Sequence, residues 1–239
     1  MALVQGMNGP PIRDLQAALN LRLNPSPNLR VSGHYDAATA DAVRIFQRAN
    51  WLAVDGIVGP ATMDAIEGRE QGAQIRHNIP YFPQPAPHLG WAAAVAMIRR
   101  SSPAAVRQMT PSRFLTPQGD LVGDAIGHHQ RAEMHRAFAS QHALRYRPAR
   151  NWPVSALLQV LRAGPVMVEY PRRAAAHVRG TGSLFLVLTG ARGAHRPDGL
   201  STTLRVFDPD GEHTPGIYSL SHADLMERVP PGGYAMFWL

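Results

Sequence analysis

A glutamine and the start of an alanine-rich helix lie six residues apart in the sequence, at Gln84 and Gly90. The N-terminus of a helix stabilises negative charge, and an amide side chain can donate a hydrogen bond to a developing oxyanion. The pair would therefore suit acyl transfer if a nucleophile began the helix. Gly90 has no side chain, however, and the chain contains no cysteine. The alternative is purely structural, with a surface turn at Pro83–Pro85 and a buried helix face at Trp91–Ala94.

The stretch from Ile79 to Ala94 resembles the active-site segment of papain-like cysteine proteases, in the bacterial and effector branch of that superfamily. In that family a glutamine lies six residues before the nucleophilic cysteine, which is followed by Trp-Ala-Ala at the start of a helix. The resemblance implies that Gly90 occupies the cysteine position and that Gln84 occupies the position of the oxyanion donor. A working protease would need a thiol that this chain does not have.

The second half of this resemblance lies between residues 157 and 210. An amphipathic helix, a Gly-Pro step, an apolar strand ending in Thr189-Gly190 and a strand ending in Asp208-Pro follow one another in the family's order. The family's histidine begins the strand that ends in Thr-Gly. Counting back from Gly190 places that position at Leu184, or at Ser183 if the register shifts by one residue. Asp208 matches the aspartate that orients the histidine.

Neither position carries a histidine, and His177 lies seven residues before Leu184. With nucleophile and base both missing and the surrounding pattern retained, the sequence argues against a working thiol mechanism. It predicts a degenerate papain-like domain whose remnant site comprises Gln84, Gly90, Ser183, Leu184 and Asp208.

A group of histidines raises the question of a metal site. His128 and His135 are seven residues apart in an expected helix, with Glu133 between them, so a metal could bridge them on one face. This spacing differs from the zinc-protease pattern of two histidines four apart with a glutamate between them. We therefore predict surface histidines, with no metal and no cofactor.

An internal repeat with a period of 23 residues marks the first part of the chain, where Gly33–Val43 aligns with Gly56–Ile66. Each copy has a glycine turn, an apolar residue, a threonine near a helix N-cap and an amphipathic helix. Ile12–Leu21 also has helical apolar spacing. We therefore expect three short helices between residues 3 and 67.

These residues closely resemble the three-helix peptidoglycan-binding module of bacterial wall hydrolases. The matching positions are Leu15, Gln16, Leu19, Gly33, Tyr35, Asp36, Thr39, Ala42, Val43, Phe46, Gln47, Leu52, Asp55, Gly56, Val58, Gly59 and Thr62. The apolar positions are expected to form the core. The resemblance implies peptidoglycan as the ligand, and the polar positions supply candidates to bind it. The candidate ligand-binding residues are Tyr35, Asp36, Arg44, Gln47 and Asp55, with Trp91 in the second domain.

The polar, glycine-bearing segment between the two resemblances reads as a linker. We predict a helical domain at 1–67, a linker at 68–76 and a papain-like domain at 77–239, which together give an α+β protein. All 24 basic residues are arginine, and the formal net charge is +7. The arginines are scattered and no nucleic-acid fold signature accompanies them, so we expect no nucleic-acid partner. A basic surface would also suit an anionic bacterial envelope.

No segment is long and apolar enough for a membrane span, and no signal peptide is visible at the N-terminus. A wall-binding protein must nevertheless reach the wall. We expect export to the periplasm or cell envelope, or delivery by a leaderless secretion system.

Three functional hypotheses remain open. The preferred one is a wall-binding pseudoenzyme whose papain-like domain binds a peptide or protein ligand. The second is a cell-wall hydrolase or toxin that uses other residues, such as Asp208, Glu169 or a histidine. The third is an adaptor or immunity-type protein that binds a secretion-system partner.

Overall fold

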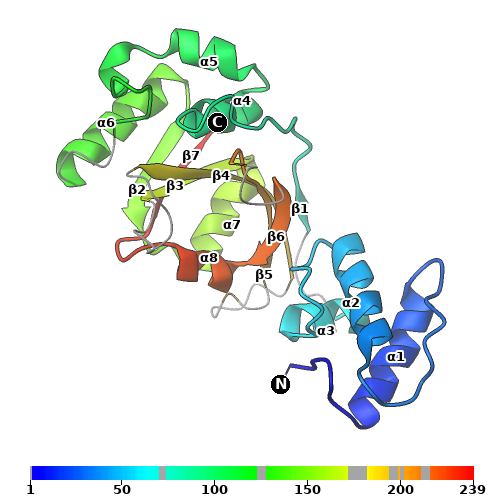
Figure 1. The fold of residues 1–239 in the computed structure, drawn as a ribbon. Helices are drawn as coiled ribbons and strands as arrows, with labels where there is room; N and C mark the ends of the chain where they lie inside the picture. Colours follow the sequence, from blue (N-terminus) through cyan, green and yellow to red (C-terminus); the bar gives the residue numbers. More distant parts are fainter. Residues whose placement is uncertain are drawn as a thin grey trace. The chain divides into compact units, whose positions relative to one another are not determined.

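The computed structural model describes residues 2–69, 74–122, 128–171, 182–193, 199, 202–210 and 216–239. The chain divides into two compact units (Figure 1). The first comprises Met1–Gln74 with Arg192–Leu204 and Ser219–Ala223, and the second comprises Ile75–Ala191, Arg205–Tyr218 and Asp224–Leu239. In the described part of the chain, no helix has the length and apolar character needed to cross a membrane.

Three helices build the N-terminal module: α1 (Pro10–Arg22), α2 (Ala37–Ala49) and α3 (Pro60–Glu67). A proline at the first helical position starts α1 and α3, where its missing N–H costs nothing. Asp36 caps α2 by accepting a 2.8 Å hydrogen bond from the backbone N–H of Thr39. Gly68 ends α3 in the left-handed conformation. The predicted three-helix module is confirmed.

The 23-residue repeat appears in the structure as two equivalent glutamine contacts. Gln16 accepts from the backbone N–H of Gly33 (3.0 Å) and donates to the carbonyl of His34 (2.9 Å) and to Thr39 Oγ1 (3.0 Å). Gln16 therefore links α1 to the glycine loop at Gly33 and to Thr39 of α2, the helix that follows.

Gln47, which lies 31 residues after Gln16, makes the same contacts with the second copy of the repeat. It accepts from the N–H of Gly56 (2.9 Å) and donates to the carbonyl of Ile57 (2.9 Å) and to Thr62 Oγ1 (3.3 Å). Both glutamine side chains are buried, so these bonds satisfy polar groups that water does not reach. Around them pack the apolar residues Leu3, Ile12, Leu15, Leu19, Tyr35, Val43, Phe46, Leu52, Val58 and Ile66.

The remainder of the chain alternates helices with strands of one mainly antiparallel sheet. The helices are α4 (Gly90–Arg99), α5 (Pro103–Met109), α6 (His128–Gln141), α7 (Val154–Ala163) and α8 (His222–Arg228), with a 3₁₀ turn, η1, at Ser112–Phe114. The strands are β1 (Ile75–Arg76), β2 (Arg145–Arg150), β3 (Val166–Pro171), β4 (Ser183–Gly193), β5 (Thr202–Phe207), β6 (Ile217–Ser221) and β7 (Tyr234–Trp238). The predicted α+β class is confirmed.

The strand order is β2-β7-β3-β4-β5-β6, with β1 added to β4. In the centre, β3 pairs antiparallel with both β4 and β7. Residues 166–170 of β3 are buried on both faces, because α4 lies along one side of the sheet and α7 along the other (Figure 1). This two-sided cover explains why the strand reads as a continuous apolar run instead of an alternating one.

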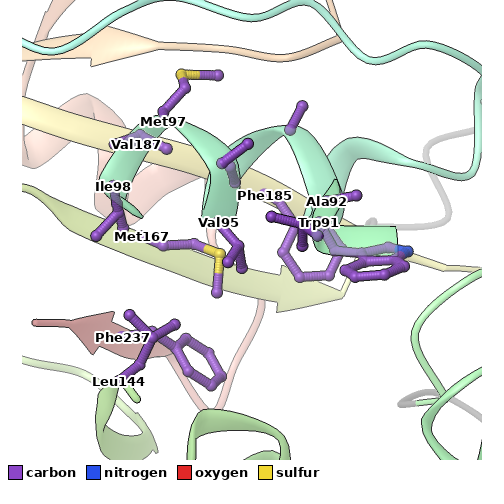
Figure 2. Close-up of a cluster of buried hydrophobic side chains, with 14 of the residues drawn as sticks. Trp91, Ala92, Val95, Met97, Ile98, Leu144, Met167, Phe185, Val187 and Phe237 are labelled. Carbon is purple, nitrogen blue, oxygen red and sulfur yellow. The ribbon is translucent and has the colours of Figure 1, made fainter. Parts of the chain in front are cut away.

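The helix α4 is the centre of the core, since its residues 91–98 are all buried. Its side chains pack on Met167 of β3, Phe185 and Val187 of β4 and Phe237 of β7 (Figure 2). Phe138 of α6 adds edge-to-face contacts with Trp91 and Phe237. The core therefore fixes the N-terminus of α4 against the sheet, which is where the sequence placed the remnant site.

Candidate functional site

Gln84 and Gly90 lie side by side, as their sequence pattern predicts. Gly90 is the first residue of α4, and a Cβ atom built on it would sit 3.1 Å from Gln84 Oε1 and 3.8 Å from Phe185 Cδ2. A side chain at position 90 would therefore project between the glutamine and β4. This is the arrangement that a nucleophile at a helix N-terminus would need.

The side chain of Gln84 is held in one orientation by Asp210. Its backbone N–H donates to the carbonyl of Pro209 (2.8 Å), and its Nε2 donates to Asp210 Oδ1 (3.0 Å). A carboxylate can only accept, so the amide N–H₂ must face Asp210 and the amide oxygen must face Gly90. Gln84 thus presents an acceptor where an oxyanion site needs a donor.

A small cleft lies in front of Gly90. Loop segments, the start of α4 and the start of β4 all contribute to its wall. The lining residues are Gln84, Pro87, His88, Gly90, Asp120, Leu121, Ser183, Leu184, Phe185, Pro209 and Asp210. Four of the five predicted remnant residues are therefore in one cleft, and the fifth, Asp208, lies beside it in the chain.

The start of β4 carries no base toward Gly90. Successive side chains of a strand point to opposite faces, and Phe185 is the β4 side chain within 4 Å of the Gly90 Cβ position. Leu184, at the position counted from the sequence, points to the other face, whereas Ser183 shares the face of Phe185. Phe185 was missed by the sequence reasoning, although the two-residue period of a strand would have shown it once Gly90 was placed.

Asp208 belongs to a tyrosine-rich turn. It is buried, and its carboxylate accepts from Tyr218 (3.3 Å) and from the backbone N–H of Asp210 (2.9 Å). Tyr81 donates to its carbonyl oxygen (2.9 Å). Burial, together with the nearby charge of Asp208, raises the pKa of both tyrosines. In this structure Asp208 holds the loop that carries Asp210 and, through it, Gln84.

Trp91 does not line the cleft. The ring is fully buried in the α4 core, and its Nε1 donates to the carbonyl of Gly119 (3.1 Å). It therefore supports the loop next to His88 and Asp120 from behind. His177, the other histidine considered for this site, lies outside the described residues.

A buried ionic group lies behind the cleft. Glu169 of β3 is 1% exposed and binds Arg131 of α6 and Ser183 of β4. Arg131 also donates to Ser183 Oγ (3.0 Å), and His135 Nδ1 is 3.9 Å from Glu169 Oε2. Arg131 and Ser183 both donate to the same carboxylate oxygen, Glu169 Oε1.

Of the two histidines considered for a metal, His135 alone has a described side chain. His135 is buried against Glu169, Tyr146 and Phe237 instead of lying on the surface. The prediction of a surface position was therefore wrong for His135, because α6 turns this face to the core. The side chain of His128 lies outside the described residues. Among those described, no group of three metal-binding side chains occurs.

The candidate ligand-binding residues of the module hold the module together. Tyr35 is fully buried and donates to the carbonyl of Gly56 (2.8 Å), and burial, aided by Asp55, raises its pKa to about 12. Gln47 donates to Asp55 (2.7 Å) as well as making the repeat contacts. Their use as ligand contacts stays a prediction.

The other two candidates are more accessible. Asp36 is exposed, and its hydrogen bonds from Thr39 lower its pKa. Arg44 is partly exposed and pairs with Asp41 at 2.8 Å. Among the five module candidates, the exposed polar atoms therefore belong to Asp36, Arg44 and Asp55.

An apolar groove that the sequence did not indicate lies between α1 and α3. It has about 860 Å³ of empty space. Leu21 on its wall is 86% exposed. The lining residues are Pro11, Asp14, Leu15, Ala18, Leu21, Arg22, Met63, Ile66 and Glu67.

The family model of the papain-like cysteine protease AvrRpt2 matches residues 73–219, more than half of the chain. The chain belongs to the AvrRpt2 family of papain-like cysteine proteases. In this AvrRpt2-family chain, the matched region contains Gln84, Gly90, the start of β4 and Asp208. The family assignment predicted from these residues is confirmed.

A second family model, that of the peptidoglycan binding domain, matches residues 8–66 and confirms the second resemblance. This AvrRpt2-family chain is also 39% identical over 64 residues to a zinc D-Ala-D-Ala carboxypeptidase of Streptomyces albus G. The match covers 27% of this chain and 25% of that protein.

Among solved structures, a Burkholderia AP3 phage endolysin matches with 23% identity and a TM-score of 0.27, over 60% of this chain and 52% of the endolysin. A likeness at this TM-score supports no inference about fold or function. The chain therefore spans about a quarter of the curated relative and about half of this solved structure.

Proposed function

We propose that this protein binds bacterial peptidoglycan through its N-terminal module and holds a wall peptide in its papain-like cleft without cutting it. The proposal that the cleft holds a peptide without cutting it is supported by the geometry of Gly90 and Gln84. The nucleophile position is Gly90, and the amide of Gln84 is turned toward Asp210, so that its oxygen faces Gly90. Neither covalent attack nor oxyanion stabilisation by this glutamine is available there.

The peptidoglycan-binding family match supports the first part, and the α1–α3 groove supplies a surface for it. The groove combines methyl and methylene groups with Arg22, Asp14 and Glu67. Stem peptides of the wall combine alanine methyl groups with free carboxylates and amines. An apolar groove with a few charged groups suits such a ligand. We also propose that the protein acts in the cell envelope, because its ligand is there.

Sedimentation with intact sacculi tests both binding and catalysis. The full chain is mixed with sacculi and centrifuged, and the supernatant is examined by mass spectrometry for released fragments. We expect protein in the pellet and no muropeptides in solution. Released fragments would refute the pseudoenzyme and support the hydrolase hypothesis. Protein that stays in solution without products would refute wall binding and support an adaptor or immunity role.

Two matched substitutions locate the wall-binding surface. Leu21→Asp places a charge in the α1–α3 groove, whereas Ile45→Asp places one on α2, where Ile45 is 51% exposed and does not line the groove. We expect the first to lower sacculus binding about tenfold or more, the cost of burying an uncompensated charge against the ligand. The second should change it less than twofold. Equal effects would show that the groove is not the site.

Peptide binding in the cleft is tested with a synthetic stem pentapeptide and isothermal titration calorimetry. Gly90→Leu fills the space between Gln84 and Phe185, and its backbone angles accept a side chain. In the Leu21→Asp background, where the α1–α3 groove no longer binds, we expect Gly90→Leu to abolish peptide binding, whereas Gly90→Leu alone should leave sacculus sedimentation through the module intact. Unchanged peptide affinity would show that the peptide binds elsewhere.

A further inference from the structure

The outer strand of the sheet carries a row of arginines. Strand β2 begins the strand order, so β7 is its sole neighbour among the described strands. Arg145, Arg147 and Arg150 occupy the two ends and the middle of β2, and Arg145 and Arg150 are exposed. The strand therefore presents three cations at an edge of the molecule.

Two of these guanidinium groups make cation–π contacts with tryptophan rings. Arg147 Cζ is 5.3 Å from the ring centroid of Trp152 and 5.7 Å from that of Trp238. Arg150 Cζ is 4.3 Å from the ring centroid of Trp152. Trp152 is fixed in turn, since it is 8% exposed and its Nε1 donates to the carbonyl of Tyr234 (3.1 Å).

Stacking holds a guanidinium by its face and leaves the N–H groups at its edge free to donate. The side chains are therefore already ordered, and a ligand that binds them loses less conformational entropy than one that must order flexible arginines. Arg113 and Arg228 also lie over aromatic rings, but singly, whereas β2 carries its arginines in a row.

The spacing of the row is set by the backbone. Arg145 and Arg147 are two residues apart on one face of β2, about 6.6 Å along the strand. The pairing with β7 then shifts register between Arg147 and Arg150. Gly233 permits this shift, because a Cβ there would sit 1.9 Å from the carbonyl carbon of Arg150. The bulge brings Arg150 to the same tryptophan as Arg147.

None of the three arginines has a carboxylate partner within the described residues. Other arginines do have such partners, since Arg131 pairs with Glu169 and Arg44 pairs with Asp41. A row of fixed, uncompensated guanidinium groups attracts anions, and its planar donor edges match the paired oxygens of phosphate groups. A spacing of several ångströms between charges suits a polymer with one phosphate in each short repeat.

We propose that the β2 row of Arg145, Arg147 and Arg150 binds the phosphodiester backbone of an anionic polymer attached to the bacterial cell wall. This site is separate from the α1–α3 groove and the papain-like cleft in the residues that form it. It would add a charge-dependent contact with the wall to the peptidoglycan contact.

The test uses the full chain and purified poly(ribitol phosphate) teichoic acid, with affinity measured across a series of salt concentrations. In one variant all three arginines are replaced by glutamine. A matched control replaces three exposed arginines outside β2, Arg13, Arg48 and Arg107, so both variants lose the same net charge. We expect the β2 variant to lose affinity tenfold or more and the logarithmic salt dependence to become shallower by about 2 to 3. The control should stay within threefold of wild type.

Three outcomes would overturn the proposal. The first is an equal loss in both variants, which would show that net charge alone acts. The second is unchanged affinity in the β2 variant. The third is tighter binding of the wild-type chain to single-stranded DNA of matched charge, which would make nucleic acid the partner.

Because the stacked arginines also contribute packing, a second variant replaces the three residues by lysine. It keeps the charge and loses the planar donor edge. We expect an affinity between those of the wild-type chain and the glutamine variant, together with a near-ultraviolet circular dichroism spectrum like that of wild type. Lysine that fully restored affinity would contradict the argument from guanidinium geometry.

Discussion

Replacing Gln47 by methionine tests whether this residue holds the module together or contacts the ligand. Methionine keeps the length of the side chain and removes its hydrogen bonds. Gln47 makes bonds of 2.7–3.3 Å to the loop at Asp55–Ile57 and to Thr62. The N–H of Gly56 and the hydroxyl of Thr62 would lose this partner inside the module, where water does not replace it.

The magnitude follows from these two groups. A buried polar group without a partner costs about 1–3 kcal/mol, so the loss of two such partners should cost the module about 2–6 kcal/mol. Amide hydrogen exchange of the full chain, followed by mass spectrometry, measures this loss in the module by itself. The peptides that cover residues 33–66 should exchange at least about 30-fold faster, at 1.4 kcal/mol for each factor of ten. Arg48→Met, on the next position of α2, is the control and should change stability by less than about 0.5 kcal/mol.

An exchange rate within threefold of wild type would refute the structural role assigned to the glutamine contacts. If sacculus binding were nevertheless lost, Gln47 would be a ligand contact, as the sequence predicted. If exchange accelerates and binding falls together, the loss of binding follows from the loss of folding.

Two further predictions concern the papain-like domain. His142 is buried with its Nδ1 unpartnered, and burial lowers its pKa to about 4. As the pH falls, His142 is protonated in the unfolded chain at a higher pH than in the folded protein. The free energy of unfolding should therefore fall by about 3 kcal/mol between pH 6.5 and pH 4. Urea unfolding at several pH values measures it, and a His142→Leu variant that kept the same slope would show that another group titrates. Gly233→Ala should destabilise the protein by about 1–3 kcal/mol, because φ is +81° and the Cβ meets Arg150. A thermal unfolding midpoint equal to that of the wild-type chain would contradict this contact.

Much of the local structure could be predicted from the sequence. The three module helices are signalled by Pro10, Asp36 and Gly68 at their ends and by apolar residues at helical spacing. These signals are read within a few residues, so they do not depend on the rest of the fold. The six-residue spacing between Gln84 and Gly90 is likewise read locally from the sequence. The absence of a thiol is a property of composition alone and needs no structure.

Two properties of the candidate site depended on contacts between distant segments. The orientation of Gln84 is set by Asp210, 126 residues away in the sequence. The face that β4 turns to Gly90 depends on register, so counting back from Thr189-Gly190 indicated Leu184 or Ser183 and not Phe185, whose side chain lies next to Gly90. Register is set by which face the core buries, and a one-residue difference exchanges every side chain between the two faces.

The module shows the same division between pattern and packing. The family pattern identified Tyr35 and Gln47 but did not show whether they belong to the core or contact a ligand. A polar residue recurs at a fixed pattern position in either case. Their burial became visible when the helices packed around them.

The sequence by itself therefore determined the three module helices, the apolar strands that end near Tyr170, Gly190 and Asp208, and the missing nucleophile, which follow from local signals and composition. Only the tertiary structure decided which polar groups are already paired, where the α1–α3 groove opens and how the β2 arginines stack on Trp152 and Trp238. These properties arise from contacts between residues that are far apart in the chain, and no local pattern records them.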